Sequence, residues 1–201
     1  MTVLKQRSQE LQTVAWRSGK VRLIDQTALP DELRYVNLAD WREVAEAIRT
    51  MVVRGAPAIG CTAALGLAQS ARGIIAESRE ALIARMEDIA GSLEQARPTA
   101  VNLGWAVRRV MRVAENTPGS ADDVRDAVLE EALDMLAEDV EVNRRLGSYG
   151  AERLPAGGSV LTHCNAGALA TVAFGTALGV IRAAVEAGKR IHVYADETRP
   201  R

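Results

Sequence analysis

The sequence predicts an α/β protein in which a mostly helical region, residues 1–150, precedes a parallel-sheet β-α-β unit, residues 151–201. Two observations support this fold class. Apolar residues recur at helical spacing through most of the first 150 residues. After Pro155-Ala156-Gly157-Gly158 the pattern changes to two short apolar runs on either side of one helical segment. That pattern is typical of two parallel strands joined by a crossover helix.

Composition excludes several classes of protein. The 201 residues carry a formal net charge of −1 and only 3% are aromatic, so we expect no nucleic acid partner. No run of about 18 apolar residues could span a membrane, and the segment after Met1 is too polar for a secretory signal. Two cysteines, Cys61 and Cys164, and two histidines, His163 and His192, show no metal-binding spacing. We therefore expect free thiols, a cytoplasmic location and no structural metal.

The N-terminal region is predicted to start with a short hairpin and to continue as helices. Alternating apolar residues around Ser18-Gly19-Lys20 predict the hairpin within residues 11–36. Asp40, with Glu43 three residues later, is a typical N-cap for the first helix. The further helices are expected from Pro57 to about Ser70, up to Arg97, up to Thr117, and from Ser120 to Gly147.

The C-terminal region is predicted as a buried strand at 159–164, a turn, a helix at 168–187 with a break near Gly175, and a second strand at 191–197. Parallel sheets need cover on both faces, and three or more strands are usually required for stability. We therefore expect residues 151–201 to be the start of a larger, doubly wound domain, and the chain to be truncated.

The segment Arg54-Gly55-Ala56-Pro57-Ala58-Ile59-Gly60 is the first candidate site. Small residues just before a helix leave backbone N–H groups free to reach an anion, and the adjacent arginine adds a positive charge. This pattern indicates a phosphate site. The alternative is a tight turn, a capped helix and a surface arginine.

The segment Arg97-Pro98-Thr99-Ala100-Val101-Asn102 is the second candidate site. We place Arg97 at a helix start, where a lone positive charge opposes the helix dipole. An anion between the guanidinium and the helix would remove that conflict. The alternative is an arginine that points into water.

Cys164, within His163-Cys164-Asn165-Ala166-Gly167, is the third candidate. It is expected at the carboxyl end of a parallel strand, where open α/β sheets bind their ligands. A helix N-terminus directly after it would lower its pKa. The alternative is an inert, buried cysteine, with His163 hydrogen-bonded in the core. Cys61 lies within a small-residue helix and is expected in the core.

A fourth segment, Asp196-Glu197-Thr198-Arg199-Pro200, follows the second strand and is expected at the same rim of the sheet as Cys164. The alternative for it is a solvated strand end. No P-loop, G-x-G-x-x-G or G-x-S-x-G pattern occurs in the sequence. Nucleotide binding and serine hydrolysis are therefore not supported.

Taken together, these segments resemble a known family. The motifs that carry the resemblance, besides Leu23-Ile24-Asp25-Gln26 and Leu29-Pro30, are MVVRGAPAIG at 51–60, RPTAVNL at 97–103, LTHCNAGALAT at 161–171, GTALGVIR at 175–182 and ETRPR at 197–201. The family is methylthioribose-1-phosphate isomerase, which is related to the regulatory subunits of the eukaryotic initiation exchange factor. The resemblance spans almost the whole chain.

The resemblance implies a Rossmann-like C-terminal domain and an aldose-ketose isomerase, that is, an intramolecular oxidoreductase. The reaction it implies converts 5-methylthioribose 1-phosphate to 5-methylthioribulose 1-phosphate in methionine salvage. By resemblance, Arg54, Gly55, Ala56 and Arg97 bind this sugar phosphate, and Cys164 is catalytic. The resemblance also implies a homodimer at full length, with no metal and no other cofactor.

Members of the family continue beyond ETRPR, where they carry a catalytic aspartate. We therefore expect the 201-residue chain to lack that group and to be inactive or nearly so by itself. Two alternatives stay open: a ribose-1,5-bisphosphate isomerase, and a non-catalytic regulatory subunit of the same superfamily. Ala166-Gly167-Ala168 is closer to the methylthioribose enzyme, and the intact HCNAG motif around Cys164 speaks against a regulatory subunit.

Overall fold

The structure is a computed structural model that describes residues 11–196. It begins with a three-stranded antiparallel sheet of β1 (Val14–Arg17), β2 (Lys20–Ile24) and β3 (Tyr35–Leu38), in the order β1-β2-β3. Ser18 and Gly19 both have positive φ angles, 50° and 76°, as a two-residue hairpin turn requires. The predicted hairpin is therefore confirmed, and the structure adds a third strand to it.

Five α-helices follow: α1 (Trp41–Arg49), α2 (Ala56–Gly73), α3 (Arg79–Ala96), α4 (Val101–Asn116) and α5 (Ala121–Arg153). The predicted N-caps Asp40 and Ser120 are confirmed. Asp40 accepts hydrogen bonds from the first-turn backbone of α1, and Ser120 forms a capping box with Asp123 at the start of α5.

The prediction that the last of these helices ends at Gly147 is wrong, because α5 continues to Arg153. Gly147 has a packing role instead of a capping role. A Cβ atom at this position would lie 2.7 Å from the ring of Phe174 and 3.0 Å from the carbonyl oxygen of Gly179. The missing side chain therefore lets the segment after residue 173 approach α5 closely.

The C-terminal region holds β4 (Gly157–Thr162), the short 3₁₀ helix η1 (Ala168–Ala170), α6 (Ala177–Glu186) and β5 (Arg190–Ala195). The strands β4 and β5 pair in parallel, as predicted, with Val160 opposite Val193. The predicted mixed α/β class is confirmed.

Two details of this C-terminal region differ from prediction. Of the helix expected at 168–187, only Ala177–Glu186 is α-helical, and Ala168–Ala170 form a 3₁₀ turn. The break expected near Gly175 is confirmed, because Phe174 and Gly175 adopt positive φ angles of 68° and 93° that no α-helix accommodates. The expected buried strand is exposed: Leu161 is 72% exposed in β4, and Tyr194 is 57% exposed in β5. The division into domains at residue 150 stays a prediction, and α5 runs across that position.

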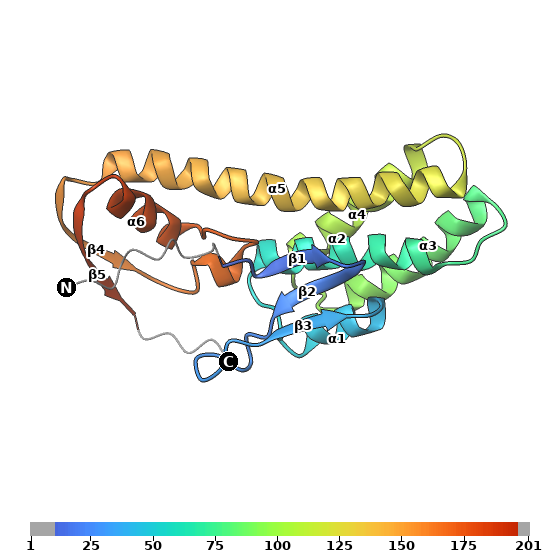
Figure 1. Cartoon of the computed structure of the whole chain (residues 1–201), viewed down its shortest axis with the longest axis horizontal. Coiled ribbons are helices and arrows are strands. Elements are labelled where there is room, and N and C mark those ends of the chain that lie inside the picture. The colour runs from blue at the N-terminus through green and yellow to red at the C-terminus, as the bar shows by residue number, and fades with distance from the viewer. Residues whose placement is uncertain (1–10, 197–201) are drawn as a thin grey trace.

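Helix α2 forms the centre of the core. Every residue from 58 to 71 is buried, so α2 is surrounded on all sides by α1, α3, α4, α5 and the three-stranded sheet. Small residues make this possible: a Cβ atom at Gly66 would lie 2.7 Å from a methyl carbon of Val44 in α1. The long helix α5 extends past this core, and α6, β4 and β5 lie beside its final turns (Figure 1).

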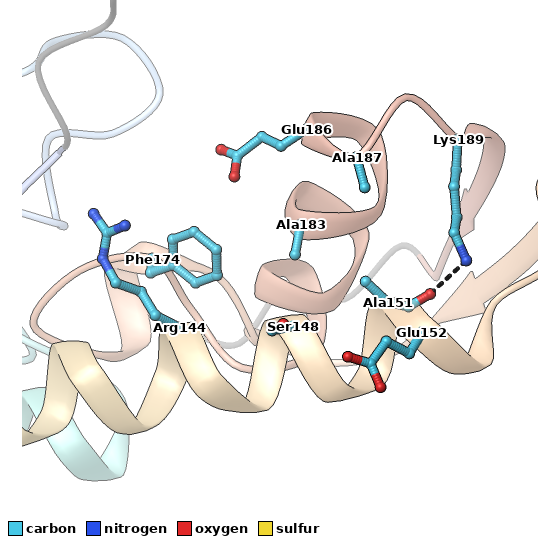
Figure 2. A pocket seen from close by; sticks show the side chains of 9 residues that line it. All are labelled: Arg144, Ser148, Ala151, Glu152, Phe174, Ala183, Glu186, Ala187 and Lys189. Carbon is cyan, nitrogen blue, oxygen red and sulfur yellow. Dashed lines mark hydrogen bonds between the residues drawn. The ribbon is translucent and has the colours of Figure 1, made fainter.

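Helix α6 docks on the end of α5 around a hollow of about 420 Å³ (Figure 2). The buried ring of Phe174 lies near two guanidinium groups, 5.4 Å from that of Arg144 and 5.2 Å from that of Arg182. The Lys189 ammonium donates a hydrogen bond to the carbonyl oxygen of Ala151 at 2.7 Å and another to that of Leu154. These contacts cap the C-terminus of α5 and attach the β4-α6-β5 unit to it.

Candidate functional site

Gly55 is the N-cap of α2 and has a φ angle of 97°, which favours glycine. A Cβ atom there would lie 2.4 Å from the Cα atom of Ala170 in η1, so no larger residue fits without movement of the backbone. Within the described residues no side chain caps this end of α2, and Pro57 occupies its second position, one later than predicted. The N-terminus of α2 therefore keeps backbone N–H groups without a side-chain acceptor, as an anion site requires.

Arg97 is not at a helix start, and the prediction that placed it there is wrong. It is the C-cap of α3, whereas α4 begins at Val101 with Ala100 as its N-cap. A positive charge is favourable at a helix C-terminus, so the predicted conflict between Arg97 and a helix dipole does not exist. Arg97 still precedes the N-terminus of α4, which, like that of α2, has no side-chain cap.

The first turns of α2 and α4 are neighbours. A Cβ atom at Gly60 in α2 would lie 3.0 Å from the carbonyl oxygen of Asn102 in α4. Beside this contact is a hollow of about 210 Å³ that extends to Cys61, Trp105 and Asp139. The first two candidate segments therefore come together through their helix N-termini.

Cys164 is exposed two residues beyond the end of β4. The alternative of a buried, inert cysteine is therefore wrong. Its φ angle is 70°, a left-handed conformation that is uncommon outside glycine and concentrates at functional sites. No α-helix follows it directly, because α6 begins at Ala177, so the expected helix N-terminus behind the thiol is absent. Cys61 is buried in the core as expected, and burial raises the pKa of its thiol.

His163 and Asp196 confirm that the ends of the two parallel strands share one rim. The Nδ1 atom of His163, after β4, lies 2.6 Å from Oδ2 of Asp196, after β5. His163 is exposed, so its expected alternative, a hydrogen-bonded core histidine, is wrong. Glu197, Thr198, Arg199, Pro200 and the ETRPR motif lie outside the described residues.

The segment that follows Cys164 is held against the N-terminal region by three polar side chains, of which Thr13 and Gln26 are buried and Asp139 is partly buried. The carbonyl oxygens of residues 168 and 169 and the N–H of residue 172 are their partners. The contacts are Thr13 Oγ1 to Ala168 O at 2.7 Å, Gln26 Nε2 to Leu169 O at 2.7 Å, and Val172 N to Asp139 Oδ2 at 2.7 Å. Together with the Gly55–Ala170 approach, they bring the first and third candidate segments side by side.

Two carboxylates near this junction have opposite electrostatic environments. Burial raises the pKa of Asp139 in α5 more than its hydrogen bonds from Val172 and Asn143 lower it. Burial also opposes ionisation of Asp25, but hydrogen bonds from Thr27 and Arg34 outweigh it, so the pKa of Asp25 is lowered. The environment of Asp139 therefore disfavours its charged form, whereas the environment of Asp25 stabilises its charged form.

Sequence reasoning missed the roles of Thr13, Gln26 and Asp139. The sequence pattern could have pointed to Asp139. It lies four residues from each of the buried residues Met135 and Asn143, so it belongs to the buried face of α5. For Thr13 and Gln26 the partners are more than 140 residues away in the chain, and no local pattern reveals them.

Within residues 11–196, no three His, Cys, Asp or Glu side chains gather in a way that could hold a metal ion. In the same part of the chain, no helix combines the length and the apolar character needed to cross a membrane.

Residues 52–201 match the Initiation factor 2 subunit family. The chain belongs to this family. Within the Initiation factor 2 subunit family it is similar to the methylthioribose-1-phosphate isomerases of Geobacter metallireducens and Geobacter sulfurreducens. Each is 53% identical over 189 residues, which are 94% of this chain and 55% of the relative. The resemblance that the motifs indicated is confirmed.

Two solved structures share the fold. The 5-methylthioribose 1-phosphate isomerase from Pyrococcus horikoshii OT3 has a TM-score of 0.88 and 43% identity, over 94% of this chain and 53% of that one. The translation initiation factor eIF-2B, subunit delta, from A. fulgidus has a TM-score of 0.85 and 45% identity, over 94% and 55%. The chain therefore spans about half the length of the relatives it matches. The roles of Arg54, Gly55, Ala56, Arg97 and Cys164 stay predictions.

Proposed function

We propose that this protein is an aldose-ketose isomerase that converts 5-methylthioribose 1-phosphate to 5-methylthioribulose 1-phosphate in methionine salvage. One observation carries the proposal: the exposed, strained Cys164 and the uncapped N-terminus of α2 are joined through the contact of Gly55 with Ala170. The two relatives that are 53% identical to this chain are both named methylthioribose-1-phosphate isomerase, which supports the proposed reaction.

The reaction explains why both kinds of group are needed. In an aldose 1-phosphate the phosphate blocks ordinary ring opening, so the enzyme has to assist cleavage of the ring C–O bond. It then moves one hydrogen from C2 to C1, and no atom is gained or lost overall. Backbone N–H groups of Gly55 and Ala56, with the guanidinium groups of Arg54 and Arg97, would bind the phosphate. The thiol of Cys164 would exchange a proton or stabilise the transition state.

Three further properties belong to this proposal: activity without a metal or other cofactor, a cytoplasmic location, and a homodimer at the relatives' full length. The resemblance also assigns a catalytic aspartate to a part of the relatives that the chain does not cover. Loss of one of two acid–base groups lowers a rate by about 100- to 10,000-fold. We therefore expect a chain without that aspartate to be slower by a factor of this order than a complete product of the gene that carries it.

The test is turnover of 5-methylthioribose 1-phosphate by that complete product, with Cys164→Ser as the variant and Cys61→Ser as its matched control. We expect Cys164→Ser to lower kcat by about 100- to 10,000-fold and Cys61→Ser to leave it unchanged, since Cys61 is buried in the core. Full activity of Cys164→Ser would remove the catalytic role of the thiol.

A second candidate function is favoured by one comparison, the structure named as subunit delta of an initiation factor, with a TM-score of 0.85. A regulatory subunit would turn over no sugar phosphate, and a ribose-1,5-bisphosphate isomerase would prefer the bisphosphate. Parallel assays with the two sugar phosphates therefore separate all three functions. Absence of turnover on both would overturn the isomerase proposal.

A further inference from the structure

Gln26 lies between the two candidate segments and contacts both. It follows β2 and is 1% exposed. Its backbone N–H donates to the carbonyl oxygen of Val52 at 2.9 Å. Its side-chain amide donates to the carbonyl oxygen of Leu169 at 2.7 Å, and more weakly to that of Arg54 at 3.5 Å. Both carbonyls accept, which places the amide nitrogen, and not the oxygen, between them.

The remaining polar atom of this side chain, Oε1, is buried and has no hydrogen-bond partner among residues 11–196. A buried, unsatisfied acceptor costs about 1–3 kcal/mol. An apolar side chain of the same length would avoid that cost and fill the same space. The amide therefore contributes what an apolar side chain cannot, namely the orientation of the two carbonyl groups that it joins.

The orientation of the Leu169 carbonyl group is connected to the position of the Cys164 thiol through the backbone. Residues 167–172 begin three residues after Cys164 and pack so closely on Gly55 that a Cβ there would lie 2.4 Å from Ala170. On the other side, the carbonyl oxygen of Ala166 accepts hydrogen bonds from the N–H groups of Thr176 and Leu178, at 3.0 and 3.2 Å. The backbone from the end of β4 through η1 thus has one attachment to the start of α6, at Ala166, and another to Gln26, at Leu169 within η1.

We propose that Gln26 is a positioning residue of the isomerase site, which fixes the register between the phosphate-binding loop at Arg54 and the loop that carries Cys164. This inference rests on the proposed function. Gln26 acts through the backbone of its neighbours and does not itself touch the reacting atoms. Displacement of a reacting group by about 1 Å costs on the order of 100-fold in rate, so loss of the bridge affects kcat more than KM.

Gln69 in α2 offers a matched control. It is also a buried glutamine, 8% exposed, and its amide also donates to two backbone carbonyls, Leu38 O at 2.9 Å and Ala39 O at 2.7 Å. It joins α2 to the end of β3, within the helical region and away from both candidate segments. Gln69→Met therefore removes two hydrogen bonds of the same type as Gln26→Met, without changing the register of the site. It also removes one that Gln69 Oε1 accepts from the N–H of Val21 at 3.3 Å, so its cost in stability is expected to be at least as large.

The experiment measures three quantities for wild type, Gln26→Met and Gln69→Met. They are kcat and KM of the complete gene product, the rate of alkylation of Cys164 by iodoacetamide, and the midpoint of thermal unfolding. We expect both variants to unfold at lower temperature. We expect Gln26→Met alone to lower kcat by about 10- to 100-fold and to change the alkylation rate several-fold.

Equal kcat values and equal alkylation rates for the two variants would show that Gln26 is merely structural, and would overturn the inference. Alkylation needs no turnover, so it separates this outcome from failure of the proposed function. An inactive wild type whose Cys164 reactivity still depends on Gln26 would remove the isomerase proposal and retain the positioning role. If Gln26→Met does not fold, Gln26→Asn, whose amide is one methylene too short to reach Leu169, carries the same expectations.

Discussion

The helical region around α2 and the β4-α6-β5 unit obtain their stability in different ways. In α2, fourteen consecutive residues are buried, and apolar side chains from four other helices and one sheet pack around them. In β4 and β5, large apolar residues such as Leu161 and Tyr194 are more than half exposed. The first region has a complete hydrophobic core of its own, whereas the second relies on its attachment to α5 and on the hydrogen bonds of residues 168–172 with Thr13, Gln26 and Asp139.

This difference shows where the candidate site is vulnerable. Cys164 belongs to the weakly packed unit, and the Arg54-Gly55 loop belongs to the well-packed region. Their relative position depends on a few polar contacts with residues 168–172 and on the close approach of Gly55. Substitutions in the core should therefore unfold the protein, and substitutions at the junction should separate the two halves of the site.

The largest expected effect is in the core. Leu65→Ala, in the centre of α2, should lower the free energy of unfolding by about 3 kcal/mol, because Leu65 is fully buried and the truncation leaves a cavity. Leu161→Ala, at a position that is 72% exposed in β4, should change it by less than about 0.5 kcal/mol. Urea denaturation of both variants checks this. Similar losses of unfolding free energy in the two variants would contradict the difference in packing between α2 and β4.

Gly55→Ala should disturb the junction. The methyl group would collide with the backbone of Ala170, and the φ angle of 97° is unfavourable for alanine, so we expect a loss of about 1–3 kcal/mol. Gly19→Ala is the control, since Gly19 has a similar positive φ of 76° but open space around its Cα atom. Hydrogen exchange should increase at residues 166–176 in Gly55→Ala but not in Gly19→Ala. Unchanged exchange there would mean that Gly55 does not control the docking.

The smallest effects concern the two carboxylates, and their signs are opposite. The pKa of Asp25 is lowered from 3.8, so its stabilisation is present above that value and is lost as the pH falls through the lowered pKa. The pKa of Asp139 is raised, so its contribution is present below 3.8 and is lost as the pH rises through the raised pKa.

We therefore expect Asp25→Asn to destabilise the protein at pH 7 by about 1 kcal/mol, and the difference from wild type to shrink in acid. Asp139→Asn should gain stability relative to wild type as the pH rises from about 4 to 7. Unfolding free energies measured over this pH range check both signs. The same sign for both variants would show that burial does not dominate at Asp139.

Local patterns in the sequence predicted most of the helices correctly. Asp40 and Ser120 start helices where expected, and Arg97 ends one, because caps and breakers act within three or four residues of themselves. The parallel pairing of the two C-terminal strands also followed from the sequence, since a strand, a helix and a second strand have one common arrangement. The candidate segments at Arg54 and Cys164 were found in the same way, as motifs.

The tertiary structure decided what these patterns do. Gly147 has the appearance of a helix end, yet it is a point of close packing for Phe174, because an element distant in the chain lies against it. The sequence left both a buried and an exposed Cys164 open. Cys164 is exposed, because no other element of the described residues packs over it. Gln26 meets Leu169 across 143 residues of sequence. Local interactions determine where elements begin and end, whereas burial and long-range hydrogen bonds depend on neighbours that only the folded chain brings together.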